Sequence, residues 1–140
     1  MHDDFRDQLQ TRFGLATTPI LGAEFRALSQ QWTECFCPNM KRRVGKSLVD
    51  GYRWHAYSFG YESAVTGQRA FDLYAAMPLQ PFVMFLESDD LMFACAADQW
   101  PDLRPFEEDI YIFPRTMEWT FITTHEMSAG LGPYFATRPT

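Results

Sequence analysis

Three histidines are the side chains best suited to acid–base chemistry in this sequence, because histidine titrates near neutral pH. His2 lies next to the first residue of the chain. His55 lies within an aromatic segment, Trp54–Ser58, where a neutral ring could complete a polar niche in a core. His125 follows a β-rich run, a position at which a scaffold can present a functional group to a ligand. For each of the three, a purely structural role remains an open interpretation.

A site shared by the last two histidines would make the protein an enzyme or a small-molecule-binding protein. If the segments that hold them are neighbours in a sheet, one pocket could contain His55, Tyr57, Thr124, His125 and Glu126. The sequence has no G-x-S-x-G, no H-E-x-x-H and no glycine-rich phosphate loop. Enzymatic activity is therefore not indicated, and no catalytic residue is assigned.

The cysteines give no sign of a metal centre. Cys35, Cys37 and Cys95 lack the paired spacing of a disulfide framework or a zinc site. We expect free thiols, no metal and no cofactor.

The first residues are polar, and no apolar run reaches the roughly 20 residues of a membrane-spanning helix. The sequence thus predicts a cytoplasmic protein that does not bind membranes.

Acidic residues concentrate in the second half of the chain. Residues 1–70 carry nine Lys or Arg and seven Asp or Glu, a net charge of +2, whereas residues 71–140 carry three and eleven, a net charge of −8. Such a field disfavours nucleic acid and attracts basic proteins. The one basic cluster, residues 41–46, lacks the interleaved aromatic residues of a nucleic-acid-binding surface. We predict a surface for a basic protein formed by Glu87, Asp89, Asp90, Asp98, Trp100, Asp102, Glu107 and Glu108.

Helices are predicted for the first part of the chain, residues 1–49. An apolar residue at every fourth position predicts a short first helix that ends at Gly14. Thr18–Pro19 is a start signal, and the apolar spacing after it predicts an amphipathic helix over 19–36. Residues 39–49 are predicted to form a further short helix that carries the basic cluster.

A sheet is predicted for residues 50–140, with one helix near 67–77 that Thr66 would cap. Patterns of apolar and aromatic residues predict five strands, at 52–58, 82–86, 91–97, 109–113 and 119–124. The segment 98–109 is predicted to be a loop or a short helical turn, and the tail from Gly130 to be irregular or an edge segment. Helices followed by consecutive strands indicate one α+β domain, 1–140, with a largely antiparallel sheet of about five strands.

Several of these segments resemble a family of small bacterial proteins of unknown function. The resemblance rests on a W-H-x-[FY]-S strand at Trp54–Ser58, on the helix after Gly67, and on a late pattern Y-[IV]-F…W-T…T-H-E…G-P-Y-F within 111–135. It spans roughly residues 32–135 and transfers no catalytic residue. Its members look like small acidic immunity proteins of toxin systems, which implies a protein that neutralises a basic partner.

Overall fold

The computed structural model describes residues 2–44 and 52–138. The helices are α1 (His2–Phe13), α2 (Gly22–Phe36), α3 (Pro38–Val44), α5 (His55–Ser58) and α6 (Gln68–Ala76). The strands are β1 (Ala16–Pro19), β2 (Val65–Thr66), β3 (Phe82–Leu86), β4 (Leu91–Ala96), β5 (Ile110–Phe113), β6 (Trp119–Thr123) and β7 (Tyr134–Thr137). Single 3₁₀ turns occur at Glu87–Asp89 and Met127–Ala129.

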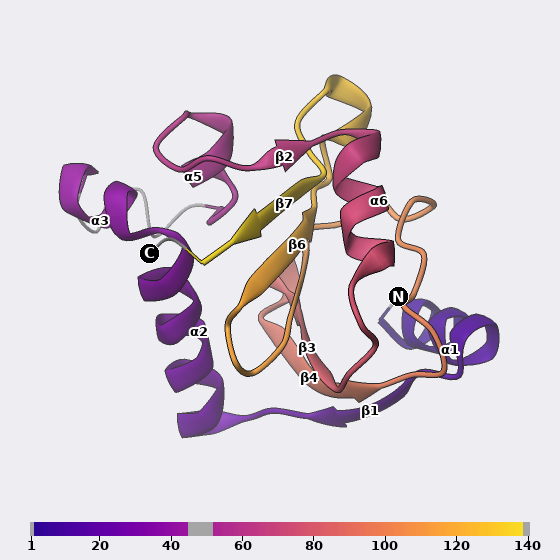
Figure 1. The fold of residues 1–140 in the computed structure, drawn as a ribbon. Helices are drawn as coiled ribbons and strands as arrows, with labels where there is room; N and C mark the ends of the chain where they lie inside the picture. Colours follow the sequence, from indigo (N-terminus) through magenta and orange to yellow (C-terminus); the bar gives the residue numbers. More distant parts are fainter. Residues whose placement is uncertain (1, 45–51, 139–140) are drawn as a thin grey trace.

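One antiparallel sheet organises the molecule, in the order β1-β4-β3-β5-β6-β7-β2. Helix α2 covers one face of the sheet and α6 covers the other (Figure 1). This arrangement confirms the predicted α+β class with a largely antiparallel sheet. The sheet has seven strands, however, and not about five.

The central strand β3 shows how the sequence fills both faces. Phe82, Met84 and Leu86 belong to the core under α6, whereas Val83 and Phe85 belong to the core under α2. Side chains alternate between the faces of a strand, so an unbroken apolar run is what a strand covered on both sides requires. The prediction of a central strand at 82–86 is therefore confirmed.

The predicted strand at 52–58 is wrong, because residues 53–54 form a turn and His55–Ser58 form the short helix α5. The amide of Tyr57 donates to the carbonyl of Trp54, and the amide of Phe59 donates to the carbonyl of His55. Strands β1 and β2 already occupy the two edges of the sheet. Alternation over so few residues fits a single buried helical turn as well as a strand, and long-range contacts decide between them.

The expected helix start at Thr18–Pro19 is also wrong. These residues end β1, where they pair with Ala94 and Phe93 of β4, and α2 begins at Gly22. Proline has no amide hydrogen, so within a sheet it suits an edge strand such as β1. The end of α2 at Phe36 agrees with the prediction.

Two further boundaries differ from the sequence predictions. Gly67, with φ 70°, precedes the first residue of α6, so Thr66 is not its cap but part of β2. The tail does not form an edge, because its strand β7 lies between β6 and β2. The short helix expected at 39–49 is present as α3 up to Val44, and its remaining residues lie outside the described part of the chain.

Candidate functional site

Glu87 is an internal carboxylate, although the sequence predicted it on an exposed surface. Its side chain is 7% exposed and forms an ion pair with Arg53 at 2.8 Å. It also accepts the backbone amide of Arg53 at 3.1 Å and the hydroxyl of Tyr111 at 2.5 Å. The guanidinium of Arg53 donates further to Ser29 and Thr33 of α2. Glu87 therefore fixes the start of the α5 segment and adds no charge to the surface.

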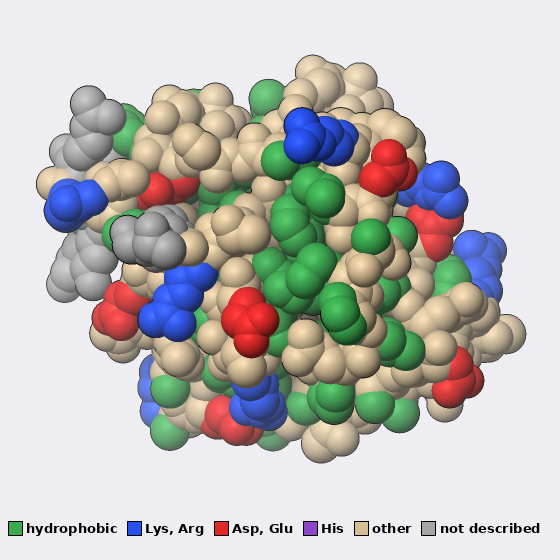
Figure 2. All heavy atoms as spheres, viewed as in Figure 1, with side chains coloured by type: hydrophobic (Ala, Val, Ile, Leu, Met, Phe, Trp, Pro, Cys, Tyr) green, Lys and Arg blue, Asp and Glu red, His purple; other side chains and the backbone are tan. Residues whose placement is uncertain are grey.

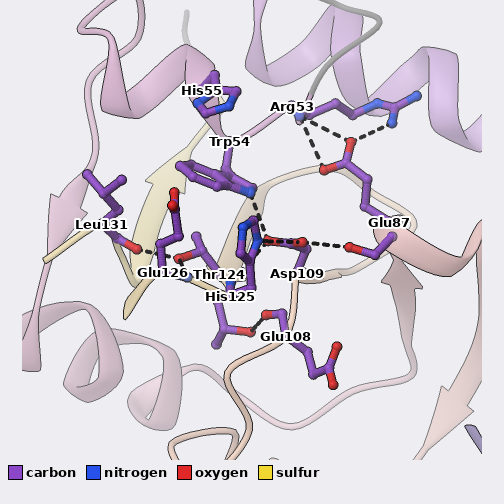
Figure 3. A network of polar contacts seen from close by, with 12 residues as sticks. Arg53, Trp54, His55, Glu87, Glu108, Asp109, Thr124, His125, Glu126 and Leu131 are labelled. Atoms are coloured by element: carbon purple, nitrogen blue, oxygen red, sulfur yellow. Dashed lines mark hydrogen bonds and ion pairs between the residues drawn. The ribbon is translucent and has the colours of Figure 1, made fainter. Parts of the chain in front are cut away.

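Asp109 is the second internal carboxylate of the acidic stretch, and it lies one residue before β5. Its side chain accepts the indole N–H of Trp54 at 2.9 Å and the hydroxyl of Ser88 at 2.6 Å. It also accepts the backbone amide of His125 at 3.1 Å and Nδ1 of the same residue at 2.9 Å (Figure 3). With four donors around it, this buried carboxylate joins α5, the β3–β4 turn and the end of β6.

His125 is held by Asp109 at one nitrogen and left accessible at the other. Because Nδ1 donates to the carboxylate, Nε2 is the nitrogen available to a ligand, and the side chain is 40% exposed. The hydrogen bond to Asp109 raises the pKa of His125, and the negative charges of Glu126 and Glu108 raise it further. The arrangement can accept or donate a proton at Nε2, as a general base or acid would.

Aromatic rings surround this histidine. The ring of Tyr52 lies 5.0 Å from that of His125 and 5.8 Å from that of His55, measured between centroids. Trp54 lies between the two histidines, 4.3 Å from His55 and 6.0 Å from His125. Burial lowers the pKa of His55, so its ring is neutral at neutral pH.

Three of the five residues predicted for the histidine pocket lie together. His55, His125 and Glu126 are neighbours, and the charges of the other two act on His55 (Figure 3). Thr124 is buried beneath them, where its hydroxyl donates to the carbonyl of Leu131 and accepts the amide of Glu126. It fixes the backbone at the site and does not face a ligand.

Tyr57 lies apart from the histidines. Its hydroxyl donates to the carbonyl of Phe36, and its ring lines a separate hollow of about 640 Å³ next to Glu62. Glu62 accepts the amides of Asn39 and Met40 at 2.8 and 2.9 Å, which are the unpaired donors at the start of α3. The sequence analysis missed Glu62, because nothing in the local sequence links it to a helix 22 residues earlier.

The exposed acids of the predicted partner surface separate into two groups. At one end of the sheet, β3 and β6 finish while β4 and β5 begin. Exposed carboxylates gather there on the turns, and Glu126 follows β6, half-buried. We call this group the acidic end: Asp89, Asp90, Glu107, Glu108 and Glu126.

The remaining predicted residues lie beyond the opposite end of β4. Asp98 is exposed there, and Asp102 forms an ion pair with Arg104 at 2.7 Å that lowers the pKa of Asp102. Trp100 is not an exposed anchor, because it is packed among core rings and its indole N–H donates to the carbonyl of Met77. These three residues therefore do not continue the acidic end.

The face shown in Figure 2 differs from the acidic end. Apolar side chains gather there over α6 and the adjoining strands, with acidic and basic side chains interspersed around them.

Within residues 2–44 and 52–138, no cluster of three or more His, Cys, Asp or Glu side chains is arranged to hold a metal ion. No helix among those residues is both long enough and apolar enough to cross a membrane.

Comparison with known proteins adds a family but no activity. A family model described as a domain of unknown function, DUF4275, matches residues 6–135. The match includes most of α1, which the sequence resemblance had left out. No curated protein and no solved structure matches the chain.

Proposed function

We propose that this chain, which belongs to the DUF4275 family, works by binding a basic protein through its acidic end. The observation that carries the proposal is the gathering of four exposed carboxylates on neighbouring turns, with Glu126 beside them. A concentrated negative field speeds the encounter with a basic partner and selects against acidic ones. A bacterial cytoplasmic protein of this kind would neutralise its partner by binding to it, as immunity proteins do.

The two internal carboxylates support this proposal by fixing the surface around the exposed ones. Asp109 holds the residues that follow β6, and Glu87 holds the segment that leads into α5. A surface that is ordered before binding loses less conformational entropy when a partner docks. The acidic end is therefore suited to specific binding.

Charge reversal tests the proposal directly. The affinity of a lysine-rich and an arginine-rich peptide should be measured by fluorescence anisotropy as the salt concentration rises. We expect weaker binding at higher salt, and loss of binding when four carboxylates are changed to lysine together: Asp89, Asp90, Glu107 and Glu108. A matched variant makes the same change of charge elsewhere and should keep most of the affinity: Asp7, Asp72, Asp98 and Glu118.

Two outcomes would contradict the proposal. One is binding that does not depend on ionic strength. The other is binding that survives the reversal at the acidic end, whether or not the matched variant keeps it. In either case the carboxylates of the acidic end are not the attachment site.

A second candidate function follows from the Asp109–His125 pair. An imidazole aligned by a buried carboxylate, with Nε2 accessible, is suited to general-base chemistry or to holding a small molecule. Hydrolysis of p-nitrophenyl acetate tests it, and the rate above background should vanish in both His125→Gln and Asp109→Asn. Equal rates in wild type and variants would rule out this role for that substrate class.

A further inference from the structure

Phe59 is an apolar side chain whose exposure the fold does not explain. Its side chain is 58% exposed, yet its ring stacks on His55 with centroids 4.6 Å apart and planes 4° from parallel. The two residues are four positions apart, and the amide of Phe59 donates to the carbonyl of His55. The stack is thus built into α5, since residues i and i+4 of a helical turn lie on one side. An ordered aromatic surface of this kind is typical of sites where partners dock.

The ring of His55 is fixed and uncharged. Its Nδ1 lies 3.2 Å from the hydroxyl of Ser58, and the ring of Trp54 packs against it. Because burial lowers its pKa, the ring carries no positive charge at neutral pH that would repel a cation. The ring of His55 is covered by Phe59 and packed against by Trp54, so the outer face of Phe59 is the π surface available to a positively charged group.

Negative charge lies next to this stack. Glu126 follows His125, and its side chain points past the ring of Trp54 toward His55 (Figure 3). Its backbone is fixed by the hydrogen bond from its amide to Thr124. From the other described residues, its carboxylate receives no hydrogen bond or ion pair. A carboxylate beside a neutral aromatic stack is complementary to a planar cation.

We propose that the partner's contact is an arginine side chain, which stacks on the exposed ring of Phe59 in the negative field of Glu126. This inference rests on the proposed binding of a basic protein and specifies the group that is recognised. A guanidinium is flat, is weakly hydrated and presents two parallel N–H donors to a carboxylate. A lysine ammonium is compact and strongly hydrated, so it gains less from the ring faces.

Peptides that differ only in the basic residue test the inference. Binding of matched arginine, lysine and citrulline peptides to the full chain should be measured by fluorescence anisotropy at fixed ionic strength. We expect the arginine peptide to bind about fivefold more tightly than the lysine peptide, and the citrulline peptide to bind most weakly. Phe59→Ala and Glu126→Gln should each remove the preference, whereas Phe59→Tyr, which keeps the ring, should retain it.

Leu21→Ala is the control for loss of an exposed apolar side chain, because Leu21 is 73% exposed at the start of α2. It should leave the preference unchanged. Equal affinity for arginine and lysine peptides, or a preference that survives Phe59→Ala, would overturn the arginine site. If that binding still depends on salt and is lost in the fourfold reversal, the proposed function stands. If no basic peptide binds at all, both proposals fail.

Discussion

The two faces of the sheet are both packed with aromatic rings, but they differ in how their buried polar groups are hydrogen-bonded. Under α6, the rings of Tyr74, Trp100, Trp119 and Phe121 are in mutual contact and use few hydrogen bonds. The indole N–H of Trp119 is buried with no partner in the described part of the chain. On the face that carries α2 and α5, a connected set of hydrogen bonds runs from Arg53 to His125 (Figure 3).

This contrast shows that one face of the sheet mainly stabilises the fold, whereas the other also positions exposed residues of the candidate site. The face under α6 gains its stability from burial, which is not directional and fixes no particular surface group. On the other face, Glu87 and Asp109 accept bonds with defined geometry from the segment that carries His55 and Phe59. The exposed residues of the candidate site are therefore placed by the polar face. Substitutions on the polar face should therefore change both the stability and the placement of these exposed residues, whereas substitutions under α6 should change the stability alone.

Asp109→Ala should have the largest effect. It leaves the indole N–H of Trp54 buried without its acceptor and removes the acceptor of the amide of His125. We expect the free energy of unfolding to fall by about 3 kcal/mol, measured by urea denaturation. The control is Glu108→Ala, which removes an exposed carboxylate one residue away and should cost less than about 0.5 kcal/mol. Similar losses in the two variants would show that Asp109 has no special structural role.

Tyr111→Phe should have the next largest effect. Its hydroxyl accepts the amide of Trp54 at 2.9 Å and donates to Glu87, so its removal leaves one buried donor and weakens the support of a buried charge. We expect a loss of about 2 kcal/mol. In an NMR spectrum, the resonances of His55 and Phe59 should also shift, because the segment that holds them loses an anchor. Unshifted resonances would contradict the positioning role of this face.

Tyr74→Phe removes the corresponding hydroxyl from the other face. That hydroxyl makes one hydrogen bond, to the carbonyl of Pro101 at 2.8 Å. We expect a loss of about 1 kcal/mol and no change in the resonances of His55 and Phe59. A loss equal to that of Tyr111→Phe, or an altered candidate site, would remove the proposed difference between the faces.

The framework of the fold could be predicted from the sequence because its signals are local. The apolar run at 82–86 predicted the central strand, and helical spacing predicted the whole of α6 and of α2, although it started α2 three residues too early. The short strands β1 and β2 gave no such signal, since four and two residues carry too little periodicity. The pattern at 52–58 was misread for a similar reason, because its conformation depends on Glu87 and Tyr111, far along the chain.

The candidate site could be predicted only in part. His55, His125 and Glu126 were expected together, and they are neighbours. The inward direction of Glu87 and Asp109 could not be foreseen, because charged residues are buried only when they find partners. Those partners, Arg53 and Trp54, are 34 and 55 residues away in the sequence. The net charge of the sequence therefore overestimated how many carboxylates lie on the surface.

The smallest expected effect is a dependence of stability on pH in which the two histidines act in opposite directions. The pKa of His125 is raised above its ordinary 6.5 in the folded state, so its contribution is complete below pH 6.5 and is lost as the pH rises through the folded value. The pKa of His55 is lowered, so the folded state loses stability as the pH falls below 6.5. Because His125 is 40% exposed, its contribution to the free energy of unfolding should be less than about 1 kcal/mol.

Urea unfolding between pH 5 and pH 9 tests these opposite contributions. On acidification, the free energy of unfolding should fall more steeply in His125→Gln than in wild type, and less steeply in His55→Gln. A profile that neither substitution alters would mean that Asp109 does not act on His125 in solution.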